Sequence, residues 1–189
     1  MAETITPVVH GGKRKPYIAA AFLHVLGATA AAALLGLALG GLGALLQAPW
    51  EDATAVVVAA AAGLYFLREA FRLPIPLPDR KRQVPEWWRT FFSPPVAALL
   101  YGAGLGVGFL TYLSFGTFAA VMAGALASGD PLVGALVCAP FGLGRAVVVV
   151  AVASAGPPIE RLDDLAGSDG LRWANAVVLL GIAAAALSF

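Results

Sequence analysis

Five long apolar stretches constrain this chain more than any other feature of its sequence. A bilayer core of about 30 Å needs roughly 20 consecutive apolar residues in a helix. Backbone polar groups find no water inside a bilayer, so a spanning segment must be a helix or part of a closed barrel. Stretches this long and this rich in Ala and Leu predict helices, because barrel strands alternate apolar and polar residues. The five stretches cover residues 17–46, 53–71, 96–126, 131–155 and 171–189.

Charge is too scarce for a water-soluble globule. Only 12% of the 189 residues are charged and 60% are hydrophobic, whereas a soluble domain carries about 25% charged residues. The 12 basic and 11 acidic residues leave no basic excess that would favour nucleic acid. The composition therefore predicts an integral membrane protein whose partner is the lipid bilayer, and neither a soluble enzyme nor a nucleic-acid-binding protein.

The basic residues predict how the helices cross the membrane. They lie before the first stretch, between the second and third, and between the fourth and fifth, while the connections 47–52 and 127–130 carry only acids. Basic loops stay on the cytoplasmic side. We therefore expect an all-α polytopic bundle of five transmembrane helices and a short interfacial helix in the plasma membrane, with the N-terminus cytoplasmic and the C-terminus outside. Its expected parts are a tail over 1–16, one transmembrane domain over 17–189 and a cytoplasmic loop over 72–95.

The long basic loop contains an aromatic segment. Prolines at 74, 76 and 78 favour an extended chain, and Pro85 is suited to begin a short helix. On such a helix four aromatic side chains would share one side: Trp87, Trp88, Phe91 and Phe92. Aromatic rings beside basic residues are typical of an anchor at the membrane interface. A docking surface for a partner protein is the alternative.

The third stretch combines glycines with hydroxyl side chains. Its Gly104-x-x-x-Gly108 pattern, like Gly36-x-x-x-Gly40 in the first stretch, permits close approach of helices. Its 31 apolar residues exceed the membrane thickness, so we expect a tilted, kinked or partly interfacial helix. Small hydroxyl groups on one helix face serve either helix packing or the lining of a substrate path. The residues concerned are Thr111, Ser114 and Thr117, with Tyr112 beside them.

The fourth stretch contains one cation, Arg145. We expect Pro140 to kink its helix and Gly142 and Gly144 to weaken it on the inner side of that kink. Arg145 would then lie roughly 15 Å from the inner end of the helix, where a charge is costly and usually faces the bundle interior. Its partners could be carbonyl groups freed by Pro140, hydroxyl groups or water, an anionic ligand, or an acid of a partner subunit.

The remaining chemistry-bearing residues predict neither a cofactor nor catalysis. Haem held by two histidines is not expected, because His24 is intramembrane and His10 lies in the polar tail. We expect His24 to be hydrogen-bonded and Cys138 to be an inert thiol. No catalytic set, metal cluster or paired carboxylates can be assembled from the sequence.

Residues 80–145 resemble the CcdA/DsbD-type cytochrome c biogenesis transmembrane family, part of the LysE-like transporter group. The resemblance is carried by the basic segment 80–84, the glycine-rich segment 101–109, the Gly129-Asp130-Pro131 loop and the Phe141–Arg145 turn. It implies a scaffold of two inverted three-helix repeats. The electron-carrying members of the family have a Pro-Cys pair in their first and fourth spans. The resemblance implies that the first family span is absent here and that Thr111-Tyr112 stands at the second of these two positions. Since thiol–disulfide relay needs an attacking and a resolving cysteine, Cys138 alone cannot perform it.

These observations favour a non-enzymatic, CcdA-like membrane protein of transport type. It would move a small anionic solute past Arg145 and the face formed by Thr111, Ser114 and Thr117. The alternative is an accessory or structural subunit of a membrane complex or homo-oligomer, which the glycine-rich faces and the incomplete repeat favour. A thiol-redox conduit that uses a partner's cysteines is a third, weaker interpretation.

Overall fold

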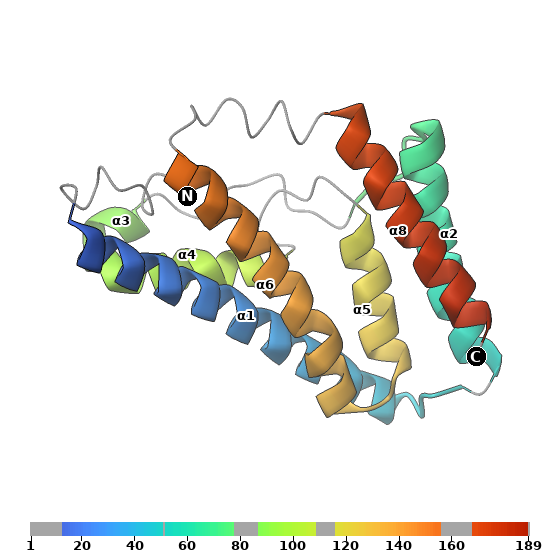
Figure 1. Cartoon of the computed structure of the whole chain (residues 1–189). Coiled ribbons are helices and arrows are strands. Elements are labelled where there is room, and N and C mark those ends of the chain that lie inside the picture. Colours follow the sequence, from blue (N-terminus) through green and yellow to red (C-terminus); the bar gives the residue numbers. More distant parts are fainter. Residues whose placement is uncertain (1–12, 51, 78–86, 109–115, 156–167, 189) are drawn as a thin grey trace. The chain divides into compact units, whose positions relative to one another are not determined.

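Every regular element in the described part of the chain is an α-helix. The computed structural model describes residues 13–50, 52–77, 87–108, 116–155 and 168–188 (Figure 1). The helices are α1 (Arg14–Leu45), α2 (Asp52–Phe71), α3 (Trp88–Phe91), α4 (Pro94–Gly106), α5 (Thr117–Ala127), α6 (Pro131–Ala155) and α8 (Asp169–Leu187). The predicted class, an all-α membrane helical bundle, is confirmed.

Four of these helices are long and apolar enough to cross a membrane: α1, α2, α6 and α8. The stretch 96–126 differs from the single tilted or kinked helix that we expected. Its first helix, α4, ends at Gly106 and is followed by Gly108, whose φ of 77° is left-handed. Glycine is the usual residue in that conformation after a helix, since it has no Cβ to clash. Its second helix, α5, begins at Thr117, so the excess length is divided between two shorter helices.

The contacts divide the chain into two units. The first unit contains α1 up to Ala32, α3, α4 and α6 from Ala139 onward. The second contains α1 from Ala33, α2, α5, the start of α6 and α8. Both long helices, α1 and α6, therefore contribute to each unit. That residues 17–189 form one domain stays a prediction.

Glycines set the packing of α1 against α4 in the first unit. A Cβ added at Gly102 would overlap the backbone of His24, and one added at Gly106 would overlap the backbone of Ala28. The two contacts have the same sequence offset, so α1 and α4 run parallel, and they lie along one another in Figure 1. Gly27 of α1 adds a third contact, because a Cβ there would overlap the carbonyl oxygen of Leu99. That Gly104 and Gly108 permit close approach stays a prediction.

Glycines also join α1 to the start of α6 in the second unit. A Cβ at Gly36 would overlap the carbonyl oxygen of Gly134, and one at Gly40 would overlap that of Asp130. These pairs run in opposite directions along the two helices, so the helices are antiparallel. The Gly36-x-x-x-Gly40 pattern does mediate close approach, as expected. Its partner is α6 of the same chain, so this pattern no longer supports assembly with another subunit.

The helices meet mainly at small residues, and many of the large apolar side chains are exposed. The core of the first unit contains Ala28, Leu105 and Ala146. The α2, α5 and α8 helices, which lie side by side in Figure 1, meet around Ala62, Ala120 and Leu179. Large apolar side chains such as those of Leu34, Leu132 and Val177 are exposed. This arrangement suits a lipid solvent, in which small interfacial residues let helices approach and large ones face the acyl chains.

Pro140 does not interrupt α6, which continues from Pro131 to Ala155. Gly142 packs against α1, since a Cβ there would lie 2.5 Å from the carbonyl oxygen of Ala28. Gly144, two residues further on, faces open space, with nothing within 4 Å of such a Cβ. That Pro140 kinks the helix and that Gly142 and Gly144 weaken it stays a prediction, and the structure adds one tight contact, at Gly142.

Substitution of these two glycines tests the packing. Gly142→Ala should destabilise the protein by about 1–3 kcal/mol, because a backbone carbonyl must move to admit the methyl group. Gly144→Ala is the matched control and should be neutral or stabilising, because alanine is the better helix former by about 1 kcal/mol. Thermal unfolding in detergent measures both. Equal stability of the two variants would contradict the contact.

Candidate functional site

Arg145 lies on α6 in the first unit and is half-buried. Its Nη1 donates a hydrogen bond to the carbonyl oxygen of Leu105 at 2.9 Å. Its guanidinium carbon also lies 5.7 Å from the centre of the Phe141 ring, within reach of a cation–π interaction. One polar partner of Arg145 is thus on another helix, α4.

The identity of this acceptor has a physical reason. Leu105 lies in the last turn of α4, where its carbonyl oxygen accepts from the backbone N–H of Gly108 at 3.2 Å but from no residue within the helix. A carbonyl oxygen has two lone pairs, so it can accept from Arg145 as well. The C-terminal end of a helix also carries a partial negative charge that favours a cation. Arg145 therefore closes the end of α4 from α6 and fastens the two helices together.

The predicted substrate path is described only in part. Thr111, Tyr112 and Ser114 lie outside the described residues. Thr117, at the start of α5 in the second unit, donates a short hydrogen bond through its hydroxyl group to the side-chain oxygen of Asn175 on α8. Thr117 thus joins two helices of its unit, whereas Arg145 belongs to the first unit.

A buried carboxylate, that of Glu69, joins helices of the second unit, and the sequence did not point to it. It lies near the end of α2 and is only 3% exposed. Its carboxylate accepts hydrogen bonds from Arg68 at 2.5 Å and from the backbone N–H of Gly116 at 3.2 Å. Gly116 immediately precedes α5, so this carboxylate caps the first turn of that helix from outside.

The backbone carbonyl of Glu69 binds a third helix, α8. Its carbonyl oxygen accepts a hydrogen bond from Nη1 of Arg172 on α8 at 2.8 Å. One residue of α2 thereby binds both α5 and α8. The signal in the sequence is an acid in the last apolar turn of a helix, between two arginines.

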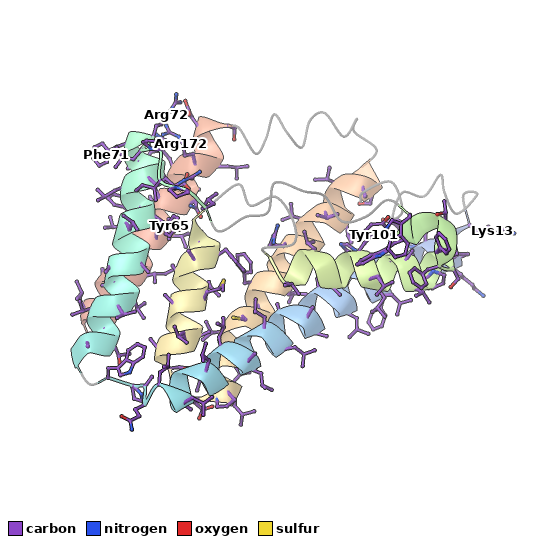
Figure 2. The ribbon with its side chains drawn as sticks, turned by 180° about the vertical axis from the view of Figure 1, so that it is seen from behind. Lys13, Tyr65, Phe71, Arg72, Tyr101 and Arg172 are labelled. Atoms are coloured by element: carbon purple, nitrogen blue, oxygen red, sulfur yellow. The ribbon has the colours of Figure 1, made fainter. Side chains whose placement is uncertain are left out.

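Further ion pairs and hydrogen bonds lie near Glu69, at the end of α2 and the start of α8. Arg72 lies 2.6 Å and Arg172 lies 3.2 Å from the carboxylate of Asp169, at the start of α8. Arg68 also donates to the carbonyl of Ile75, and Tyr65 donates to that of Pro76. Figure 2 shows Tyr65, Arg72 and Arg172 gathered at this end of α2 and α8. These contacts bind the segment after α2, and also the start of α8, to the last turns of α2.

His24 and Cys138, the other residues that the sequence singled out, are both buried. Nδ1 of the buried His24 lies 3.3 Å from the carbonyl oxygen of Ala98, which confirms the predicted hydrogen bond. A carbonyl can only accept, so Nδ1 carries the proton. Cys138 is a buried thiol. Within the described ranges, no three His, Cys, Asp or Glu side chains form a group that could hold a metal ion.

The aromatic segment forms a cluster on and around α3. Trp87 contacts the rings of Phe91 and Phe92, with centre distances of 5.6 and 6.4 Å. Trp88 turns instead toward α4, where its ring lies 5.8 Å from that of Tyr101. Trp88 thus holds the cluster on the first unit, while Trp87, Phe91 and Phe92 are exposed. An interfacial anchor at these residues stays a prediction.

Removal of the buried carboxylate tests its role in the second unit. Glu69→Ala should cost about 2 kcal/mol or more, because it leaves Arg68 without its acid and Gly116 without its acceptor. Glu69→Gln retains an oxygen for Gly116 and should cost less. Asp169→Asn is the control: it breaks ion pairs of an exposed carboxylate, which are worth about 0–1 kcal/mol. Unfolding in detergent compares the three, and an equal loss for Glu69→Ala and Asp169→Asn would contradict the role.

The comparison with family models matches nearly the whole chain. The family described as the cytochrome c biogenesis protein transmembrane region aligns with residues 4–185. No solved structure matches the chain.

Several curated relatives carry the name methylamine utilization protein MauF. The protein from Methylophilus methylotrophus is 38% identical over 130 residues, which cover 68% of this chain and 45% of that protein. The protein from Paracoccus denitrificans is 36% identical over 129 residues, or 65% of this chain and 45% of the relative. The chain thus spans less than half the length of the relatives that it matches. It is an integral membrane protein that belongs to the family of cytochrome c biogenesis transmembrane regions.

Proposed function

We propose that this CcdA-like protein is a non-enzymatic membrane accessory of an amine-utilization system. Relatives named methylamine utilization protein share about a third or more of the aligned residues. The observation that carries the proposal is the hydrogen bond from Arg145 to the carbonyl of Leu105. It gives the cation of α6 a role in holding two helices together, as a scaffold requires.

The other intramembrane polar groups support the same interpretation. Thr117 binds Asn175 across α5 and α8, and His24 binds the backbone of α4. Glu69 binds the start of α5 and, through its carbonyl, α8. In each case a polar side chain or backbone group joins one helix to the next, as interhelical hydrogen bonds do in membrane bundles. A partner subunit would then be recognised by the assembled bundle.

The single cysteine limits what chemistry the accessory could perform. Thiol–disulfide exchange proceeds through a mixed disulfide that a second thiol resolves. These 189 residues contain one cysteine, Cys138, which is buried. A redox version of the proposal would need cysteines from outside these 189 residues, and the accessory role does not need Cys138 to react.

Transport of a small anionic solute is the second candidate. It rests on the half-buried cation of α6, because a guanidinium at depth in an apolar bundle can attract an anion. The path would include Thr111, Tyr112, Ser114 and Thr117. Flux across a membrane distinguishes transport from the accessory role.

For the orientation, we propose that the N-terminus lies in the cytoplasm and that the membrane is the plasma membrane. The ion pair of Arg72 with Asp169 supports it, because it brings the end of α2 and the start of α8 to one side of the second unit. The arginines at those two ends, Arg68, Arg72 and Arg172, thus share a side, as cytoplasmic basic residues do.

Deletion of the gene tests the accessory role. The deletion strain should lose growth with methylamine as the sole nitrogen source and keep normal growth with ammonium. A plasmid copy with Cys138→Ala should restore growth, because the thiol has no reaction to perform. Growth curves on the two nitrogen sources measure this.

Two results would contradict that prediction. Normal growth of the deletion strain on methylamine would remove the link to amine use. Uptake of a radiolabelled anion such as phosphate by protein-containing liposomes, lost in Arg145→Gln, would favour transport over the accessory role.

Cysteine labelling tests the orientation. In a Cys138→Ala background, Gln47→Cys should react with a membrane-impermeant maleimide in intact spheroplasts, because residue 47 lies in a predicted outside connection. Lys13→Cys should react only after the membrane is opened. The reverse pattern would show that the N-terminus lies outside.

A further inference from the structure

We propose that the start of α1 and the aromatic cluster of α3 form one binding surface for anionic phospholipid headgroups. The surface contains two chemically different parts: the exposed cations Lys13, Arg14 and Lys15, and the exposed rings of Trp87, Phe91 and Phe92. Both parts belong to the first unit.

The register of α1 and α4 brings the two parts to the same end of the unit. Gly102 packs on His24 and Gly106 packs on Ala28, so the two helices run parallel at a constant offset. The same offset places Pro94, the first residue of α4, level with Pro16 near the start of α1. Trp88 holds α3 against the first turns of α4 through Ala97 and Tyr101. Both figures show α3 beside the start of α1, and Figure 2 places Lys13 at this end.

The positions of Lys13, Arg14 and Lys15 favour binding of an anion from outside the chain. Arg14 and Lys15 occupy the first turn of α1, which contains no acid. The positive end of a helix dipole disfavours cations, so their position costs free energy unless a negative charge lies nearby. In the part of the chain that the structure describes, the ion pairs are those of Arg68, Arg72 and Arg172, and no carboxylate pairs with Lys13, Arg14 or Lys15.

The aromatic rings identify the source of that anion as a lipid. Trp87 is 53% and Phe91 79% exposed, a cost in water that burial among acyl chains removes. Trp87 also contacts both neighbouring phenylalanines, so the rings form a compact wedge. Tryptophan favours the headgroup level of a bilayer, and basic residues at that level attract anionic lipids. A phospholipid with a net negative headgroup satisfies both parts of the surface at once.

Lipid retention by the purified protein tests this surface. The delipidated full chain in detergent is mixed with phosphatidylglycerol or phosphatidylcholine of the same acyl chains, and bound lipid is counted by native mass spectrometry. The wild type should prefer phosphatidylglycerol by about tenfold, and added salt should reduce that preference. The triple variant Lys13→Gln, Arg14→Gln, Lys15→Gln should lose it, while the charge-conserving triple variant Lys13→Arg, Arg14→Lys, Lys15→Arg should keep it.

The aromatic part has its own variants. Phe91→Ala should weaken retention of both lipids by several-fold, because it removes contact with the acyl chains. Leu132→Ala is the matched control, since Leu132 is 71% exposed on α6, and it should retain both lipids as strongly as the wild type does. For the cations, Arg72→Gln in the second unit should leave the preference unchanged.

Three results would overturn the proposal. The first is equal retention of the two lipids by the wild type, which needs no variant. The second is an unchanged preference in the triple glutamine variant or an equal loss in Arg72→Gln. The third is loss of a stoichiometric partner protein from Phe91→Ala with retention of both lipids unchanged, which would make the aromatic cluster a protein-docking surface.

Discussion

Contact between helix backbones is the interaction on which the described structure depends. In lipid, the apolar side chains of a helix gain little by leaving the solvent, so helices associate through close van der Waals contact and hydrogen bonds. Gly102 and Gly106 bring α4 onto α1, and Gly36 brings α1 onto α6. Each of these positions lacks room for even a methyl group. The bulky residues are then free to face outward, where they match the acyl chains.

The same constraint explains why so few polar groups suffice. With the helices in contact, a single polar side chain can reach the neighbouring backbone. Arg145 reaches the end of α4, where it is a second donor to the Leu105 carbonyl beside the N–H of Gly108. Glu69 reaches the start of α5, where the N–H of Gly116 has no acceptor within that helix. A cation thus meets a helix C-terminus and an anion meets a helix N-terminus, and each pairing satisfies a backbone group together with a helix dipole.

The sequence predicts the helical class and four of the long helices well, because run length and the absence of charge depend only on local composition. It does not predict where the stretch 96–126 divides, since glycine at 108 can either continue an apolar helix or end it in a left-handed turn. It also does not predict the contact of Gly142 with α1, because Ala28 is more than a hundred residues away in the chain. Tertiary contacts decide both outcomes.

The candidate site shows the same division. Arg145 stands out in the sequence because a cation in an apolar helix is rare and costly, but its acceptor could not be identified, because Leu105 is an ordinary apolar residue that contributes only its backbone. Glu69, in contrast, does not stand out in the sequence, because an acid beside two arginines is ordinarily part of an exposed ion pair. Its burial arises from α5, whose first N–H it caps, and from α8, whose Arg172 binds its carbonyl. The acid is therefore placed by two helices that its own sequence neighbourhood does not contain.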